Sequence, residues 1–436
     1  MNASRTTSSF SRRGFLGLAG AAAVLPVLAA CAPGGGSGGG TGAPLKFWDM
    51  PWGEPGYTVA AKKLVESYVP RSGLPKASYQ SIQWNNFSQT FSSAIASKTG
   101  PAVSTGGGFQ AFQFADQGAI AYADGLIDAM KKSGQLDDFL PGTIESMKTG
   151  KGYVAVPWQL DMRVMWYRKS LLEKAGAGVP TDWDSFRETS KALAKIGVFG
   201  FGVGAGAGNN FGNHAMVAMM IGNGGGMFDA DGKPDLVTDR NIEAMEFVRE
   251  LVSLGAVDPA AVSYTTDNLT TQWKTNRIGM GWNTAGLPAS IGDTGDILVT
   301  SPLTGPHGDK ATLAFGNNIM MYTNTPSQEA SEAFLTWYLK SMKALWDQDV
   351  IPALPVLRSI AESENFKKNT QADKIIREWQ PVSKTFGATS AALFGALAAV
   401  DGGQAITQFS QTMLQGKTDA KTALQTFQSA IEAVVK

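Results

Sequence analysis

Cysteine and histidine are nearly absent from the 436-residue sequence, which contains only Cys31, His214 and His307. A single cysteine excludes an intrachain disulfide, and an oxidising compartment permits disulfides without requiring them. These three residues also leave little for a metal site or a Cys–His nucleophile. Neither a G-x-S-x-G elbow nor a Walker A loop occurs. We therefore expect no catalytic residues, no metal ion and no cofactor.

An excess of charge of either sign is also missing, because Lys plus Arg and Asp plus Glu each number 37. No basic stripe suggests nucleic acid binding, and no second apolar segment beyond the N-terminal region suggests a membrane channel. The hydrophobic content of 43% is that of a packed globular protein. The body of the chain, from about Pro44 to Lys436, is long enough for two ordinary domains.

Two short segments look like ligand loops but fail in detail. Residues 202–207 loosely fit G-x-G-x-x-A, yet a convincing strand–helix–strand frame is missing, so we interpret them as a loop bending around a cleft. Residues 229–232 look like part of a calcium loop, but the later ligands of that pattern are absent and a surface turn is the simpler interpretation. The paired carboxylates of a glycosidase carry no spacing signature, so an exported carbohydrate-active enzyme stays an alternative.

The N-terminus carries the features of an export signal. Arg12 and Arg13 precede Gly-Phe-Leu, which resembles the twin-arginine motif, and the following residues 14–30 have no charge. Residues 28–31, LAAC, resemble the lipobox of bacterial lipoproteins, in which the cysteine is lipidated and the chain is cut just before it. The alternative is a permanent N-terminal anchor helix, for which the apolar run is short.

These motifs divide the first part of the chain. We expect residues 1–30 to be a removable signal peptide and Cys31 to carry a lipid. Residues 31–43 are rich in Gly and Ser and would form a flexible tether after the lipidated cysteine. The protein would then be extracytoplasmic and anchored to the outer face of the cell membrane.

Strand-like and helical patterns alternate in the body. Residues 45–48 predict a strand, the four-residue spacing of apolar side chains predicts helices over 57–68 and 87–98, and residues 102–103 predict another strand. This alternation predicts an α/β fold with a largely parallel sheet.

Further along, the order of elements is less regular. Strands are expected at 153–156 and 164–167, joined by an extended polar crossing over 157–163. Helices are expected over 186–196 and 241–254, and residues 325–328 have the pattern of a capping box that begins another helix.

Tryptophans beside amides and carboxylates give the strongest functional signal. Several lie next to Pro, Gly, Asn or Gln, where strands and helices end, rather than among apolar neighbours. A sugar presents C–H faces that stack on aromatic rings and hydroxyls that pair with Asp, Asn, Gln and Arg. Ordinary packing could explain any one ring, but the set favours a polyol site. The residues of this set are Asp49, Trp52, Trp84, Asn85, Gln110, Trp158, Asp161, Arg163, Trp282, Asn283, Asn317 and Trp379.

Several segments, in order along the chain, resemble the sugar-binding lipoproteins of ABC importers of the maltose-binding-protein type (family 1 solute-binding proteins). They are LKFWD at 45–49, FSSAIASKTGP at 91–101, GYVAVPWQLDMRVMWYRKSLLEKAG at 152–176, IGNGGGMFDADGKPD at 221–235, residues 316–339 and LPVLRS at 354–359. One departure is Pro101-Ala102-Val103, where the family usually has Pro-Asp-Val, so the contact expected from that carboxylate is missing.

The resemblance implies an α/β, two-lobed periplasmic-binding-protein type II fold with a hinge and an interlobe cleft. It places the first lobe at residues 44–160 and 313–365 and the second at 161–312 and 366–436. A mono- or oligosaccharide would bind between the lobes and be delivered to the ABC permease subunits in the membrane, with the binding protein itself a monomer and not an enzyme. The alternatives are the same fold binding another solute, such as a polyamine, or an exported carbohydrate-active enzyme.

The resemblance also implies positions for the ligand contacts. Asp161 and Arg163 would face the ligand at the hinge crossing, unless they form an interlobe salt bridge with no ligand role. The remaining contacts would come from the lips of the two lobes, a stacking face and the returning crossing. These residues are Phe109 and Gln110, Asn210 and Asn213, Trp282 and Asn283, and Asn317.

Overall fold

The structure is a computed structural model that describes residues 43–53, 56–84, 87–293, 295–390 and 392–435. The predicted signal peptide, Cys31 and nearly all of the predicted tether lie outside these ranges, as does Asn85. In the part of the chain that is described, no helix is long and apolar enough to cross a membrane.

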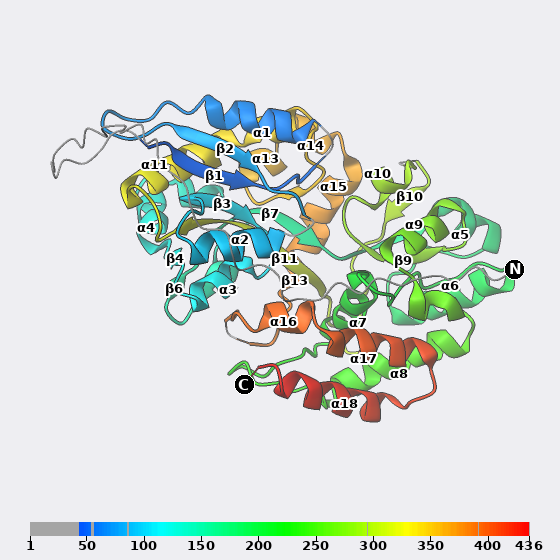
Figure 1. The fold of residues 1–436 in the computed structure, drawn as a ribbon. Helices are drawn as coiled ribbons and strands as arrows, with labels where there is room; N and C mark the ends of the chain where they lie inside the picture. The colour runs from blue at the N-terminus through cyan, green and yellow to red at the C-terminus, as the bar shows by residue number, and fades with distance from the viewer. Residues whose placement is uncertain (1–42, 54–55, 85–86, 294, 391, 436) are drawn as a thin grey trace, which may run out of the picture. The chain divides into compact units, whose positions relative to one another are not determined.

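The larger of the β-sheets has eight strands, in the order β12-β7-β11-β3-β1-β2, with β4 and β13 also paired to β11 (Figure 1). Its strands are β1 (Leu45–Asp49), β2 (Ala77–Ser81), β3 (Val103–Gly106), β4 (Ile120–Ala121), β7 (Val156–Met162), β11 (Thr312–Tyr322), β12 (Leu354–Pro355) and β13 (Ser383–Lys384). β1 is parallel to β2 and β3, whereas β11 is antiparallel to β3, β4 and β7. The expectation of a largely parallel sheet is therefore wrong, because β11 returns from a distant part of the chain and enters the sheet in the opposite direction.

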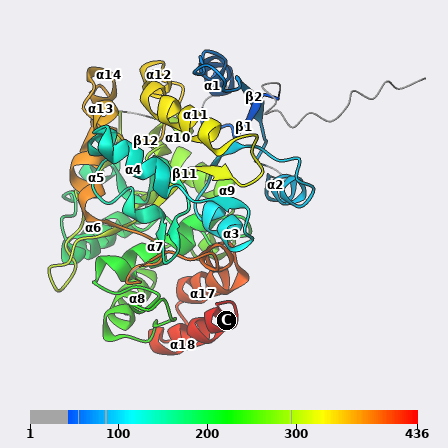
Figure 2. The same cartoon turned by 90° about the vertical axis from the view of Figure 1, so that its left-hand side faces the viewer.

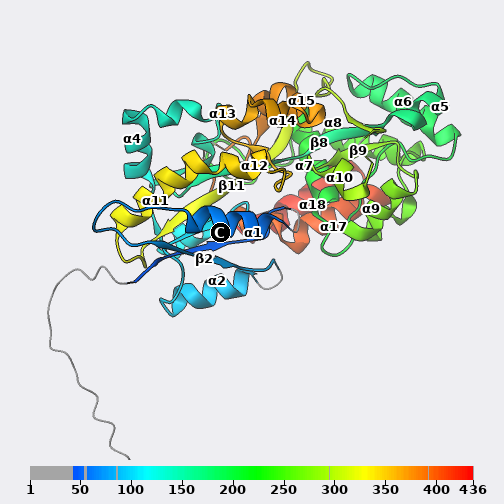
Figure 3. The same cartoon turned by 90° about the horizontal axis from the view of Figure 1, so that it is seen from above.

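Side chains alternate between the two faces of this sheet along its strands. Helices cover the apolar side chains on both faces. Phe47 in β1 contacts Phe334 and Tyr338 of α11 (Gln328–Ser341), with ring centroids 5.3 and 5.2 Å apart. The next residue, Trp48, points the other way and contacts Phe91 of α2 (Phe87–Ala96) at 5.3 Å. Figure 3 shows α11 and α2 on opposite sides of β1 and β2. Also around this sheet lie α1 (Tyr57–Glu66), α3 (Gln110–Asp116), α4 (Asp124–Lys132), α12 (Lys343–Asp347), α13 (Arg358–Ala361) and α14 (Glu364–Lys367).

A second, antiparallel sheet has the order β10-β8-β9. Its strands and neighbouring helices are β8 (Val164–Arg168), β9 (Met280–Asn283), β10 (Ile297–Val299), α5 (Lys169–Ala175), α6 (Trp183–Lys195), α9 (Thr266–Lys274), α10 (Leu287–Ile291) and α15 (Thr370–Lys374). Short elements complete the fold. They are η1 (Gln135–Asp138), η2 (Glu145–Met147), β5 (Lys148–Thr149), β6 (Gly152–Tyr153), η3 (Pro259–Ser263), η4 (Ile375–Trp379) and η5 (Gln380–Val382).

A layer of helices packs beside the second sheet, and Figure 2 shows α7 above α8, α17 and α18. The helices of this layer are α7 (Asn210–Gly222), α8 (Asp239–Ser253), α16 (Leu397–Asp401), α17 (Gln404–Gln415) and α18 (Ala420–Glu432). Residues 212–222 of α7 are buried on every side of the helix. A helix that is apolar all round belongs inside a core, and α7 packs against α8, α17, β9 and β11.

Two crossings connect the larger sheet to the second one. β7 belongs to the larger sheet and β8 to the second, and Arg163 is the one residue between them. β11 then carries the chain back, pairing Phe315 with Asp161 and Asn317 with Gln159. The backbone N–H of Arg163 donates to the carbonyl of Leu313 at 2.9 Å, which ties the two crossings together.

The structure confirms some of the local predictions and corrects others. The expected helices over 57–68, 87–98, 186–196 and 241–254 appear as α1, α2, α6 and α8, within three residues at each end. Residues 157–163, expected as a connection between strands, instead form most of β7. The helix expected after residues 325–328 is α11, but its cap is Ser327 rather than Thr325.

Both of the segments that look like ligand loops have structural explanations. Residues 229–232 form the expected surface turn, in which the Asp229 carboxylate accepts the backbone N–H of Asp231 at 2.9 Å. Residues 202–207 do not bend around a cleft, because they pack against the segment before α9. A Cβ on Gly206 would lie 2.3 Å from the carbonyl oxygen of Ser263, so only glycine permits this approach.

Candidate functional site

A cavity of about 880 Å³ opens where β7 and β11 cross between the two sheets. Its walls come from the crossing strands, the loop before α3, the start of α7, the turn after β9 and the end of α16. The predicted site residues that line it are Trp52, Trp84, Phe109, Gln110, Asp161, Arg163, Asn210 and Asn317. The structure therefore brings together at one place eight residues that are widely spaced in the sequence.

The crossing strands supply one wall through their alternation. Gln159 and Asp161 are two residues apart on β7, and their partners Asn317 and Phe315 are two apart on β11. Cross-strand neighbours share a face of the sheet, and all four of these residues line the cavity. The register of the two strands thus places two amides, a carboxylate and an aromatic ring on one surface.

A chain of charged and polar groups continues from this wall. Arg163 donates from Nη1 to Asp161 Oδ1 at 2.5 Å and from Nε to His214 Nδ1 at 2.9 Å. His214 Nε2 lies 2.7 Å from Asp401 Oδ1. The guanidinium is buried and lies over the rings of Phe315 and Phe211, at 5.2 and 5.6 Å from their centroids. Burial of an ion pair is costly unless further hydrogen bonds satisfy the charges, and this chain supplies them.

Trp52 and Trp84 form an aromatic corner of the cavity lining. The rings of Trp52 and Trp84 meet at 90° with centroids 4.8 Å apart, and Trp84 is 41% exposed. Trp84 Nε1 donates to the carbonyl of Pro51 at 3.0 Å, and Trp52 Nε1 donates to Thr105 Oγ1 at 3.0 Å. Both indole N–H groups are therefore held by the protein. Trp52 also packs on Trp158 and Trp84 on Phe87, so the exposed part of Trp84 is the main ring surface left for a ligand.

Asp49 supports this corner from below the surface. Its carboxylate is fully buried and accepts from Thr105, Tyr57, Tyr79, Trp52 Nε1 and the Met50 backbone. Burial raises the pKa of Asp49 to about 6, although these hydrogen bonds oppose the rise. Asp49 was predicted to contact the ligand, but it does not line the cavity, and its place in the structure is to orient Trp52.

Gln110 is the clearest unpaired amide of the lining. It is 7% exposed and lines the cavity, yet neither its Oε1 nor its Nε2 has a hydrogen-bond partner among the described residues. Gln159 Nε2, also buried in the lining, likewise finds no partner in the described part of the chain. Buried amides are normally satisfied, and an unpaired one costs about 1–3 kcal/mol. Both amides are therefore placed for a polar ligand.

Other predicted site residues are packed away from the cavity. Trp282, expected as a stacking face, is 5% exposed and lies against Phe186 and Phe201. Trp158 packs between Trp52 and Trp346, and Trp379 donates to the carbonyl of Thr300.

Two amides of the predicted set are used within the protein. Asn213 donates to Thr407 at 3.2 Å, and Asn283 accepts the backbone N–H of Thr284 at 2.8 Å. The resemblance implied that Asn213 lies on a lobe lip and Asn283 beside a stacking face, but both residues are almost fully buried.

The lining residues missed from the sequence include four of the side chains described above. Gln159 lies two residues before Asp161 on β7, so the period of the strand could have revealed it. His214 lies four residues after Asn210 on α7, and the helical repeat puts both on one face. Phe315 and Asp401 gave no local signal, since each reaches the cavity through tertiary structure alone.

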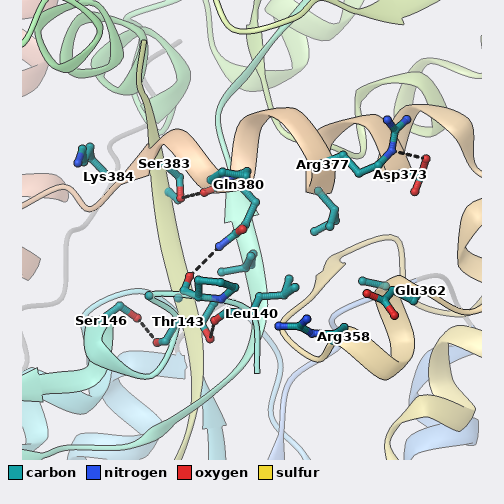
Figure 4. A pocket seen from close by; sticks show the side chains of 18 of the residues that line it. Leu140, Thr143, Ser146, Arg358, Glu362, Asp373, Arg377, Gln380, Ser383 and Lys384 are labelled. Atoms are coloured by element: carbon teal, nitrogen blue, oxygen red, sulfur yellow. Dashed lines mark hydrogen bonds and ion pairs between the residues drawn. The ribbon is translucent and has the colours of Figure 1, made fainter. Parts of the chain in front are cut away.

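A second cavity has a volume of about 800 Å³, and its lining includes Leu160, Ala314 and Gly316 of the crossing strands. Figure 4 shows some of its polar groups bonded to one another, whereas Arg358, Glu362 and Lys384 carry no such bond in this view. Gln380 donates to the carbonyl of Pro141 at 2.9 Å, and Ser383 donates to the carbonyl of Gln380 at 2.8 Å. The first cavity, with its unpaired buried amides and the exposed Trp84 ring, is the better ligand site.

Residues 75–344 match the family of bacterial extracellular solute-binding proteins. The chain belongs to this family. The match covers more than half of the sequence and includes both crossing strands. These solute-binding proteins have the two-lobed type II fold, which is the fold of this chain, whereas the exact lobe boundaries given above stay a prediction.

Solved structures of other proteins agree with this membership. A sugar transporter from Arthrobacter chlorophenolicus A6 with bound laminaribiose is 61% identical and superposes with a TM-score of 0.79, over 90% of this chain and 100% of that one. The sugar-binding protein MalE from Xanthomonas citri is 17% identical, with a TM-score of 0.74 over 90% and 97% of the two chains. The cyclic α-maltosyl-1,6-maltose binding protein from Arthrobacter globiformis is 18% identical, with a TM-score of 0.71 over 90% and 100%. The last two show the fold alone.

Proposed function

We propose that this solute-binding protein binds a neutral mono- or oligosaccharide in the cavity at the crossing strands and delivers it to an ABC permease. The observation that carries the proposal is the lining itself, in which the rings of Trp52 and Trp84 lie together with the unpaired amide of Gln110. Rings stack on the C–H faces of a sugar, and amides pair with its hydroxyls. Laminaribiose, bound by the relative that is 61% identical, is the first sugar to test.

The charges of the cavity favour a neutral ligand. Its described lining carries the carboxylates Asp161 and Asp401 and the guanidinium Arg163, and each carboxylate already has a partner. An anionic sugar would meet one cation that is already paired, and a polyamine would meet no free carboxylate. The polyamine alternative is therefore weaker than the sugar.

Binding would proceed by closure of the two lobes without chemistry on the ligand. A sugar that contacts both lobes at once favours the closed form by its extra affinity for it. We infer that the closed, loaded form docks on the permease subunits as a monomer, held near the membrane by lipid on Cys31 after export through a twin-arginine signal. The enzyme alternative predicts shortened products when the protein is incubated with oligosaccharides, and the binding proposal predicts none.

A thermal-shift screen tests the proposal. A ligand that binds only the folded state raises the melting temperature. At a ligand concentration of 100 times Kd, the free energy of unfolding increases by about 2.7 kcal/mol. We expect laminaribiose or another neutral glucan to raise it and spermidine and galacturonate to leave it unchanged. Trp84→Ala should weaken the sugar response about tenfold or more with little effect on the unliganded melting point, because this ring is 41% exposed. A shift by spermidine alone would overturn the proposal.

A further inference from the structure

His214 occupies an unusual place for a titratable side chain. It lies in α7, is 3% exposed, and lines the cavity beside Arg163. The chain has one other histidine, His307, which is half-exposed and pairs with Glu243 at 2.7 Å. His307 is not among the residues that line the cavity. Of the two histidines, His214 is therefore the one placed at the ligand site.

The hydrogen bonds of His214 fix its protonation state. A guanidinium has donors and no acceptor, so Arg163 Nε must donate to a lone pair on His214 Nδ1, at 2.9 Å. The ring is then neutral with its proton on Nε2, which donates to Asp401 Oδ1 at 2.7 Å. The imidazole thus joins α16 to the residue between β7 and β8.

The groups packed around the ring oppose a second proton. Arg163 faces Nδ1, Asp401 faces Nε2, and Asp161 lies beyond Arg163, which it binds. The other faces meet the rings of Phe315, at 4.9 Å, and Phe386, at 6.3 Å. Burial and the nearby guanidinium lower the pKa of His214, and Asp401 only partly compensates.

We propose that His214 is a positioning residue, which holds the Arg163 guanidinium in the orientation that binds sugar and does so only while its own ring is neutral. A proton on Nδ1 would point at the Arg163 N–H, so two donors and two positive charges would face each other across one hydrogen bond. Either the ring or the guanidinium must then move out of place. Sugar affinity should therefore fall as the pH drops through the pKa of His214, which burial and Arg163 hold below the ordinary histidine value. This inference rests on the proposed function, because it assumes that Arg163 contacts the sugar.

The chain offers a direct test in which His214 is the only imidazole. In the full-length His307→Asn variant, NMR titration of the single histidine reports its pKa with and without laminaribiose, while calorimetry measures affinity from pH 5 to 8. We expect the pKa of His214 to be lower in the sugar complex than in the free protein, and the affinity to be several-fold weaker at pH 5 than at pH 8. An unchanged pKa together with a flat affinity profile would overturn the inference and leave the proposed function standing. Absence of sugar binding at pH 8 would overturn both.

Two substitutions separate positioning from packing. His214→Leu removes the acceptor and should weaken binding about tenfold at pH 8 and remove the acid-dependent fall. His214→Asn offers an amide oxygen near the position of Nδ1, so it should recover part of this loss and also lack the pH dependence. If His214→Leu binds like the unsubstituted protein at pH 8, the inference fails. If either variant does not fold, the titration of the His307→Asn protein still decides.

Discussion

At the residue scale, the candidate site contains both buried polar groups that have hydrogen-bond partners and buried polar groups that have none. Gln110 keeps both atoms of its amide unpaired within the described chain, while the Asp49 carboxylate accepts several hydrogen bonds. An unpaired buried amide lowers stability, and a protein retains one where a ligand will satisfy it. The sugar proposal therefore makes a prediction about Gln110 that runs in opposite directions for stability and for binding.

Gln110→Ala should weaken sugar binding by about 1–3 kcal/mol, because the hydroxyls that the amide would meet lose their partner. The same substitution should leave the unliganded protein as stable as before, or more stable, because it removes an unsatisfied buried group. Gln117→Ala, at the exposed end of the same helix, is the matched control and should change neither quantity. Calorimetry and urea unfolding of both variants check this. A destabilised Gln110→Ala protein with normal affinity would mean that the amide is structural.

At the element scale, α7 carries Asn210 and His214 to the cavity, and its position depends on a close backbone contact. A Cβ on Gly212 would lie 2.3 Å from the carbonyl oxygen of Gly204, whereas one on Gly222 would meet its nearest atom at 3.6 Å. Gly212→Ala should therefore destabilise the protein by about 1–3 kcal/mol and weaken sugar binding, because α7 must shift. Gly222→Ala, in the same helix, should be neutral or slightly stabilising. Equal unfolding free energies for the two variants would contradict this account of α7.

The end of β1 gives a prediction that depends on pH. The pKa of Asp49 is raised from 3.8 to about 6, so the folded state holds a proton that the unfolded chain releases between these values. The native state should therefore lose stability as the pH rises from 4 to 6, by roughly 3 kcal/mol from this group. Asp49→Asn cannot titrate and should lack this term. Urea unfolding at pH 4 and pH 7 measures it, and parallel pH profiles for the two proteins would refute the assignment.

At the scale of the whole molecule, much of the fold and part of the site were predictable from sequence. Asp161 and Arg163 were found because they lie two residues apart in a segment that is typical of the family. The pairing of His214 with Asp401 spans 187 residues, and no local pattern predicts it. Trp282 and Trp379 were misplaced for the converse reason, since polar sequence neighbours do not report the aromatic and backbone groups that enclose a ring in the fold.

The central claim is that this solute-binding protein binds a neutral sugar at the crossing of β7 and β11. Isothermal titration calorimetry of the purified protein with laminaribiose, and with spermidine as the comparison, tests it most directly. The account predicts saturable heat with laminaribiose or a closely related neutral glucan, with a Kd near the micromolar range, or about −8 kcal/mol, and no heat with spermidine. Saturable binding of spermidine, with none of any neutral sugar, would contradict it.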